Sequence, residues 1–334
     1  MVNSPLSDKA KQFFFVIIKI AIVVFAFYAI YAKLFSDEQF EFSEFIQLIN
    51  QNRYFSTKIV LFIIFLSVLN WLLEIQKWKI LVSSLIKISF KSAAKQSLGA
   101  LTASLFTPNR IGEYGAKAIY FKKNERKSIL AINFLGNMMQ MGTTMLFGVV
   151  GLFFFKKYYR TRVLDFNPYI IIGILMILIL IVLFVIKKNK LKIKGIPAHL
   201  FIFSRGPIGG ALLKLEKLYT EISGKVYLKG FFISILRYLV FSFQFYFLLK
   251  HFGADLNYFN LMVIISTMYL LTSVIPSIFI FDVVIRASVA IYLFSFLEIN
   301  GIIILAVVTL MWLLNFALPS ILGSYFVLNF KLPK

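Results

Sequence analysis

Apolar runs separated by basic segments extend along most of the chain. A helix needs about 20 apolar residues to cross the hydrocarbon core of a bilayer. Runs that reach or approach this length lie at residues 13–31, 58–82, 129–155, 168–186, 230–249 and 302–330, the last interrupted by Pro319. Repeated runs of this kind predict an all-α polytopic membrane protein.

Two further apolar runs are shorter and lead into a proline. Residues 96–106 precede Pro108, and residues 261–275 precede Pro276. At about 1.5 Å per residue, the first run spans only about 16 Å, half of a hydrocarbon core. Because basic residues flank both ends of the unit around Pro108, we expect a re-entrant helical hairpin that enters from the cytoplasm and returns. The alternative is that each short helix crosses the membrane fully.

The break in this first hairpin, at residues 107–117, is the first candidate site. It holds Pro108, Arg110 and Glu113 together with two glycines. Non-helical backbone and charge persist at membrane depth only where protein or a water-filled cavity surrounds them. Pro108 should end one helix, and Asn109 is a suitable N-cap for the next, with Glu113 in its first turn. A well-capped helix start at the membrane face is therefore the alternative interpretation.

The distribution of Lys and Arg predicts the orientation. Residues 37–44 are acidic and nearly free of Lys, so we expect them outside the cell. Residues 77–95 carry five lysines, which predicts a cytoplasmic position. Both termini are then cytoplasmic, in a protein that crosses the cell (inner) membrane several times. The four basic residues within 156–162 fall on the predicted outer face, against the positive-inside rule.

The second part of the chain repeats the order of the first: span, short helix, proline break, short helix, span. Residues 115–121 and 287–294 even share an Ala-Ile-Tyr core. If the hairpins do not cross, an odd number of spans separates the two units, which makes them inverted repeats, an architecture of secondary transporters. The predicted organisation is an anchor helix with an acidic external loop (1–57), a first repeat (58–186), a basic cytosolic linker (187–229) and a second repeat (230–334).

Polar residues inside the apolar runs are further candidates. Glu74 is either paired with Lys77 or Lys79 near the interface, or it is a carboxylate that faces a pore. A stripe at helical spacing should face protein, as contacts between helices or as the wall of a polar path. The stripe consists of Asn133, Asn137, Gln140 and Thr144.

The composition narrows the function classes. The chain is 60% hydrophobic and 15% charged, values outside the range of soluble proteins. It has no cysteines, and its two histidines lie far apart, so we expect no disulfide, metal site or cofactor. The net charge is +22, and the basic residues flank apolar segments, so membrane topology explains the charge better than nucleic-acid binding does. The sequence shows no nucleotide motif and no soluble domain, and we expect no enzymatic activity.

The motif P-x-R-x-G-E at residues 108–113 resembles the transmembrane region of the lysylphosphatidylglycerol synthase family, also called the flippase-like domain family. The resemblance covers nearly the whole chain. It implies a lipid-translocating membrane domain, which in bifunctional members is fused to a C-terminal aminoacyl transferase. Here the apolar segments extend almost to Lys334, so we do not expect synthase activity. In the second repeat, Pro276-Ser277-Ile278-Phe279 replaces the glycine-rich break that precedes a Glu in the family.

The leading hypothesis is a flippase-like transporter for a membrane lipid that carries a phosphate. Helix N-termini after the two prolines, with Arg110 and Arg286, would suit phosphate oxygens. Asp282 and Arg286 could instead simply neutralise each other within a helix. The alternatives are an integral-membrane transferase acting on a lipid-linked substrate, and a membrane scaffold or accessory subunit. The predicted substrate-binding residues are Pro108, Asn109, Arg110, Gly112, Glu113, Asn137, Gln140, Pro276, Ser277, Asp282 and Arg286.

Overall fold

The computed structural model describes residues 56–105, 107, 111–159, 222–275 and 279–333, together with the isolated positions 17, 20, 24 and 173. In the last range, side chains are described from residue 284 onward. The predicted span at 13–31, the acidic loop, the span at 168–186 and most of the basic linker lie outside the described residues.

All regular structure within the described residues is helical, as the sequence predicted. The helices are α3 (Thr57–Val82), α4 (Phe90–Ser104), α5 (Gly112–Ala118), α6 (Arg126–Tyr158), α9 (Gly224–His251), α10 (Tyr258–Val274), α11 (Phe279–Ser295), α12 (Gly301–Trp312), the π-helical segment η3 (Leu313–Ala317) and α13 (Leu318–Leu328).

Four helices in the described part of the chain are long and apolar enough to cross a membrane. They are α3, α6, α9 and the continuous helix Gly301–Leu328, which combines α12, η3 and α13. Pro319 does not interrupt this last helix, because it stands in the first turn of α13, where a missing backbone N–H is tolerated. The prediction of an all-α multi-pass membrane protein is confirmed.

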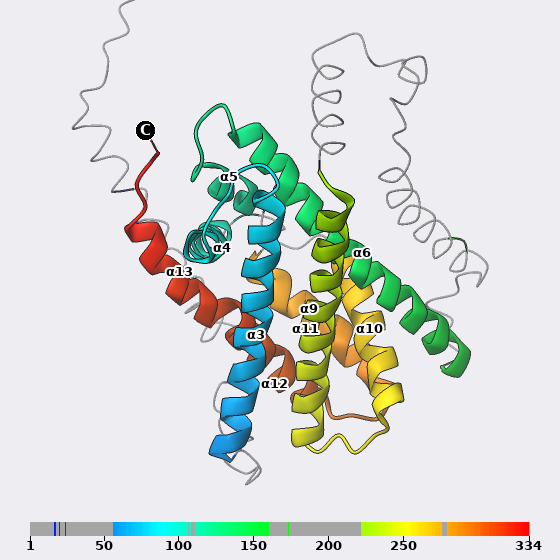
Figure 1. The fold of residues 1–334 in the computed structure, drawn as a ribbon. Helices are drawn as coiled ribbons and strands as arrows, with labels where there is room; N and C mark the ends of the chain where they lie inside the picture. The colour runs from blue at the N-terminus through cyan, green and yellow to red at the C-terminus, as the bar shows by residue number, and fades with distance from the viewer. Residues whose placement is uncertain are drawn as a thin grey trace, which may run out of the picture.

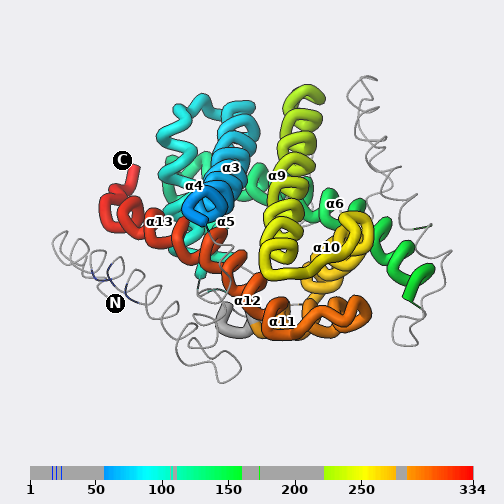
Figure 2. The backbone as a smooth tube through the Cα atoms, turned by 90° about the horizontal axis from the view of Figure 1, so that it is seen from below, coloured from blue at the N-terminus to red at the C-terminus, as the bar shows by residue number. Residues whose placement is uncertain are grey.

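The long helices run in two directions (Figure 1). In that view α3 rises and α6 descends, whereas α9 descends and the helix formed by α12 and α13 rises obliquely toward the C-terminus. The short helices α4 and α5 lie near the upper end, and α10 and α11 lie lower. Figure 2, seen from below, shows α3 and α9 side by side, in agreement with their packing contacts.

Small residues let the helices of the two parts approach closely. Helix α6 packs on α10, and α4 packs on α13. A Cβ atom added at Gly151 of α6 would lie 2.0 Å from Ser266 Oγ, and one at Gly323 of α13 would lie 2.2 Å from the Leu98 carbonyl oxygen. Packing that excludes even a methyl group is typical of helices that associate in lipid.

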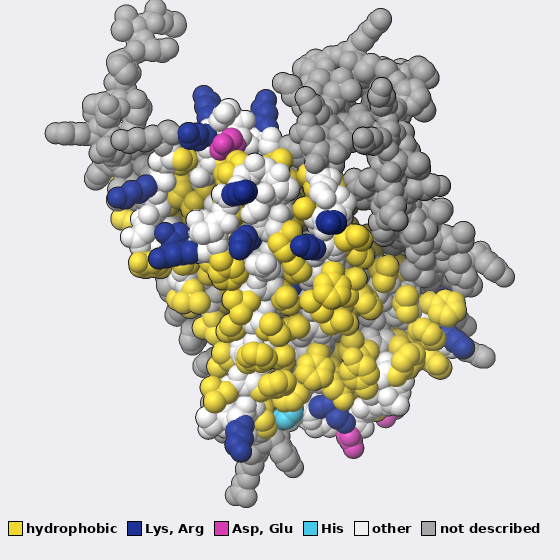
Figure 3. Space-filling view, viewed as in Figure 1, with side chains coloured by type: hydrophobic (Ala, Val, Ile, Leu, Met, Phe, Trp, Pro, Cys, Tyr) yellow, Lys and Arg dark blue, Asp and Glu magenta, His cyan; other side chains and the backbone are white. Residues whose placement is uncertain are grey.

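The molecular surface is divided between apolar and basic zones (Figure 3). Yellow apolar side chains cover the lower and middle part of the face shown, and Lys and Arg gather in the upper part. An apolar zone of this kind suits the hydrocarbon core of a membrane, and Lys and Arg suit its polar boundary.

Candidate functional site

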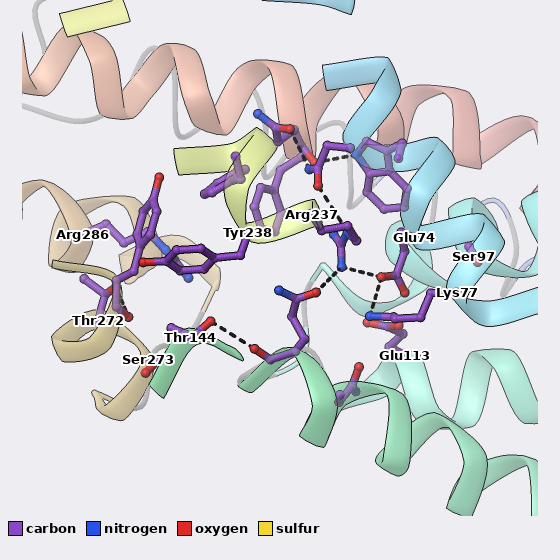
Figure 4. A pocket seen from close by; sticks show the side chains of 18 of the residues that line it. Glu74, Lys77, Ser97, Glu113, Thr144, Arg237, Tyr238, Thr272, Ser273 and Arg286 are labelled. Carbon is purple, nitrogen blue, oxygen red and sulfur yellow. Dashed lines mark hydrogen bonds and ion pairs between the residues drawn. The ribbon is translucent and has the colours of Figure 1, made fainter. Parts of the chain in front are cut away.

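A cavity of about 300 Å³ lies between the helices of the first part and those of the second. Helices α3 to α6 and α9 to α11 and the segment η3 all contribute side chains to its wall. Figure 4 shows this cavity from close by, with Glu74, Lys77, Glu113 and Arg237 on one side and Thr144, Thr272, Ser273 and Arg286 on the other, toward which Tyr238 extends. We call these two sides the ionic half and the hydroxyl half.

The ionic half is built around the carboxylate of Glu74. Glu74 Oε2 lies 2.8 Å from Lys77 Nζ, and Glu74 Oε1 lies 3.8 Å from Lys117 Nζ. Arg237 NH1 donates a hydrogen bond to Glu74 Oε2. Glu74 is therefore paired with Lys77, as one interpretation proposed, and it also lines the cavity, as the other proposed. Lys79 is not part of this cluster.

Lys117 of α5 is deeply buried, with 1% of its surface exposed. Its Nζ lies 2.7 Å from Glu113 Oε1, one helical turn away, and donates a 3.0 Å hydrogen bond to Asn133 Oδ1 of α6. The same atom lies 4.4 Å from the centroid of the Trp78 ring, within the range of a cation–π contact. A buried cation needs such partners, because an isolated charge away from water is very costly.

Arg237 joins this cluster to a chain of amide side chains. Its Nε donates to Asn70 Oδ1 at 3.2 Å, and its NH1 donates to Gln140 Oε1 at 3.0 Å. Asn70 in turn donates to Asn315 Oδ1, and Asn315 donates to Gln244 Oε1, both at 3.0 Å. The network therefore links α3, α6, α9 and η3 through side chains far apart in the sequence.

The π-helical segment η3 places Asn315 in this network. In a π-helix an extra residue widens the turn, and such turns are frequent at functional sites. Asn315 also donates to the carbonyl oxygen of Met311 at 3.1 Å, while its own carbonyl oxygen accepts from Trp71 Nε1 at 3.0 Å. The widened turn thus brings both the side chain and the backbone of Asn315 into contact with α3.

The hydroxyl half is formed by α6, α9, α10 and α11. Its wall includes Thr144, Tyr238, Tyr269, Thr272, Ser273 and Arg286. A narrow second crevice of about 30 Å³ adjoins it and shares the side chains of Tyr269, Thr272 and Arg286. The remainder of that crevice is apolar, with Phe245, Met268, Val308, Met311 and Trp312 among its lining residues.

Four of the predicted site residues line the cavity. Glu113 and Gln140 belong to the ionic half, Arg286 belongs to the hydroxyl half, and Asn137 also contributes to the wall. The stripe on α6 combines both of the roles considered for it, because Asn133 bonds to another helix and Gln140 lines a polar cavity. The remaining predicted site residues Pro108, Asn109, Arg110, Pro276 and Ser277, and the side chain of Asp282, lie outside what the structure describes.

The start of α5 differs from the sequence-based expectation. The helix begins at Gly112, with Ile111 rather than Asn109 at the N-cap position. The hydroxyl oxygen of Thr107 accepts a 2.9 Å hydrogen bond from the Gly112 N–H, so a side chain five residues back satisfies this backbone group. Gly112 permits the contact, because a Cβ atom there would lie 2.7 Å from Thr107 Cγ2. Glu113 lies in the first turn, as predicted.

Several residues of the site were not among those predicted from the sequence. Arg237 links three helices, and it is the only charged residue within the apolar run 230–249. A lone charge within a membrane span is a functional candidate on its own, so this signal was available. Lys117 stands at the end of a segment that already contains several charged residues and glycines, so it was not distinguished from its neighbours. Asn70, Tyr238 and Asn315 carry no charge that would mark them within an apolar run.

Comparison with known families agrees with this architecture. The family model described as the lysylphosphatidylglycerol synthase TM region matches residues 16–323. The chain belongs to this family. No match was found among curated proteins or among solved structures. Membership in the lysylphosphatidylglycerol synthase TM region family makes a role connected with membrane lipids the natural context for the cavity.

Proposed function

We propose that this member of the family moves a phosphate-bearing lipid, or a similar amphiphile, between the leaflets of the membrane. The observation that carries the proposal is the polar cavity enclosed among helices able to cross a membrane. Four cationic side chains and two carboxylates line its described wall, so the lining is net positive: Lys77, Lys117, Arg237 and Arg286 against Glu74 and Glu113. An anionic head group complements this charge.

The arrangement of the helices supports a pair of inverted repeats as the framework for this movement. One unit would be α3 to α6 and the other α9 to α13, with α3 and α9 running in opposite directions in Figure 1. In such a pair, α4 corresponds to α10, and α6 corresponds to the helix that ends in α13. The contact between α6 and α10 then corresponds to the contact between α13 and α4, and both contacts are present. The shared Ala-Ile-Tyr segments begin on corresponding helices, at Ala118 at the end of α5 and at Ala290 within α11, and both alanines are buried. Inverted repeats are a common basis for alternating access.

The short helices support the re-entrant hairpins within these repeats. Helix α4 has 15 residues and α5 has 7, so neither matches the length of about 20 residues that a crossing requires. Helices α10 and α11 have 17 residues each, at the lower limit. Both pairs contribute side chains to the cavity, which is the role of broken helices in transporters.

The basic segments support an orientation in which the upper end of Figure 1 faces the cytoplasm. The adjoining ends of α3 and α4, with the turn between them, carry five lysines within residues 77–95, and the turn between α5 and α6 holds Lys122 and Lys123. The C-terminus lies at the same end. Short loops with an excess of Lys and Arg stay on the cytoplasmic side. The cell (inner) membrane is the proposed location.

The test is reconstitution of the purified protein into vesicles that contain a fluorescent phosphate-headed lipid in both leaflets. A membrane-impermeant reductant bleaches the outer leaflet, and further bleaching reports movement from the inner leaflet. We expect wild type to accelerate this loss and Arg237→Gln to abolish most of the acceleration. Lys250→Gln is the matched control, because its ion pair with Asp255 lies at the surface, away from the cavity. Equal rates for empty and protein-containing vesicles would refute the proposal.

The same vesicles test the enzymatic alternative. An integral-membrane transferase would leave a chemically altered lipid, which mass spectrometry of the extracted lipids detects. Movement without new lipid species supports the transporter, whereas new species that depend on Glu113 or Glu74 support the transferase. A scaffold predicts that substitutions at Arg237 and Glu113 leave lipid movement at the level of the wild type.

A further inference from the structure

The two halves of the cavity differ in how their hydrogen-bond donors are used. In the ionic half, the cations Arg237, Lys77 and Lys117 all donate to protein oxygens, although the hydroxyl group of Ser97 on this side has no hydrogen-bond partner among the described residues. In the hydroxyl half, the phenolic groups of Tyr238 and Tyr269 have no hydrogen-bond partner among the described residues. These two side chains are only 4% and 8% exposed, so lipid and bulk water do not compensate them. Two buried, unsatisfied donors on one wall call for an acceptor from outside the protein.

The aliphatic hydroxyl groups nearby cannot take this role in the same way. Thr272 donates to the Met268 carbonyl oxygen at 2.9 Å, and Ser273 donates to the Leu270 carbonyl oxygen at 2.7 Å. Their protons are therefore committed to the backbone of α10, as is usual for Ser and Thr in membrane helices. The hydroxyl donors that this half offers to a ligand are therefore phenolic.

Arg286 adds a permanent positive charge to the same wall. It lines both the cavity and the adjoining crevice, as Tyr269 does. The rings of Tyr238 and Tyr269 lie edge to face, with their centroids 6.0 Å apart, so the two phenols belong to one site. In Figure 4 Tyr238 extends from α9 toward the side of the cavity that carries Arg286 and Thr272.

We propose that Tyr238, Tyr269 and Arg286 form the subsite for the phosphate group of the lipid. This inference rests on the proposed function and assigns its ligand chemistry to one half of the cavity. A phosphate has several acceptor oxygens and no requirement for donors, so it matches two phenolic O–H groups and a guanidinium. The ionic half, in which the three cationic donors are already paired, then holds the helices together instead of binding the phosphate.

The adjoining crevice indicates that the phosphate belongs to a lipid. Phosphate in a lipid stands at the junction between a polar head and hydrocarbon. Arg286 and Tyr269 occupy such a junction, with the polar cavity on one side and the apolar side chains of Phe245, Met268 and Met311 on the other. A free phosphate ion would gain nothing from an apolar neighbour, whereas the first methylene groups of a lipid chain would be removed from water there.

The test measures binding of dioctanoyl phosphatidic acid to the full-length protein in detergent by isothermal titration calorimetry. We expect Tyr238→Phe and Tyr269→Phe each to raise Kd roughly ten- to hundredfold, the effect of losing one hydrogen bond to a charged group. Tyr246→Phe is the matched control, because Tyr246 lies on α9 but packs against Tyr258 and lines neither the cavity nor the crevice. Glycerol 3-phosphate and dioctanoylglycerol serve as separate arms, and both should bind much more weakly than the phosphatidic acid.

A second measurement separates binding from folding. Each Tyr→Phe change removes only an unpaired buried hydroxyl group, so the melting temperature of the lipid-free variant should equal or exceed that of wild type. Lower stability together with unchanged affinity would overturn the inference.

The outcomes also separate this inference from the proposed function. Wild-type affinity in both Tyr→Phe variants, with loss of affinity in Arg237→Gln, would place the phosphate in the ionic half and overturn the subsite while leaving the transporter intact. Tight binding of glycerol 3-phosphate would overturn the assignment to a lipid. Tyrosine-dependent binding without lipid movement in vesicles would confirm the subsite and refute transport.

Discussion

The ionic half of the cavity predicts unequal effects for the two partners of its central contact. Glu74 is shared by Lys77, Lys117 and Arg237, so Glu74→Gln leaves buried cations facing one another. Removing one partner of a buried ion pair costs about 3–5 kcal/mol. Arg237→Gln leaves Glu74 with Lys77 at 2.8 Å, and the new amide can still donate to the neutral amide oxygens of Asn70 or Gln140. The net loss should therefore be limited to about 1.5–3 kcal/mol, the range for one hydrogen bond to a charged group. Glu74→Gln should therefore be the more destabilising change.

The assay is equilibrium unfolding of the purified variants in one detergent, with the double variant completing a mutant cycle. Because the two side chains are in direct contact, the double variant should be more stable than the sum of the single effects predicts, by about 0.5–3 kcal/mol. Lys250→Gln is again the control, since Asp255 is 98% exposed and surface ion pairs contribute at most about 1 kcal/mol. Additive effects, or a larger loss for Arg237→Gln than for Glu74→Gln, would refute the reasoning.

Two further predictions follow from the fold. Gly323→Val should destabilise the protein by at least about 2 kcal/mol, because the new side chain would meet the Leu98 backbone. Gly142→Ala should be neutral or slightly stabilising, since nothing lies within 4 Å of its Cβ position. Unfolding of both variants measures the difference, and equal stability would contradict the close packing. Cysteines introduced at Lys123, between α5 and α6, and at Asp255, between α9 and α10, should react with an impermeant maleimide from opposite sides of the membrane. Labelling of both from one side would refute the proposed arrangement.

Much of the fold could be predicted because a bilayer leaves few alternatives. Apolar length alone located α3 to within one residue, since a crossing helix satisfies its own backbone groups. Polar helix ends were harder to predict. Helix α4 begins at Phe90, well before the apolar run at 96, because Ser89 caps it by accepting a hydrogen bond from the Ser92 N–H at 3.1 Å. Hydrophobicity is not informative about a first turn in which Lys91 and Ser92 stand between Phe90 and Ala93.

The site was only partly predictable, because its contacts join residues far apart in the chain. Glu113 and Arg286 were identified because charge inside an apolar region is costly and therefore unusual. The partners of Arg237 lie 97 to 167 residues away, and no local pattern connects them. Tyr238 and Tyr269 are inconspicuous in a chain with 16 tyrosines. Only the packing of α9 against α3 and α10 shows which tyrosines face the cavity.

The contrast between the two halves indicates which conformation a ligand would favour. A ligand shifts an equilibrium only through a difference in affinity between two states. In the present state the Arg237 cluster ties α9 to α3 and α6, so moving these helices apart must break charged contacts within the membrane. Tyr238 follows Arg237 along α9, but neighbouring residues of a helix point in different directions, and Tyr238 extends toward Arg286 and away from the Arg237 cluster (Figure 4). A phosphate held by Tyr238, Tyr269 and Arg286 would therefore leave the Arg237 cluster intact. Under the proposed function, phosphate binding favours the present state, in which α9, α10 and α11 bring these three side chains to one wall.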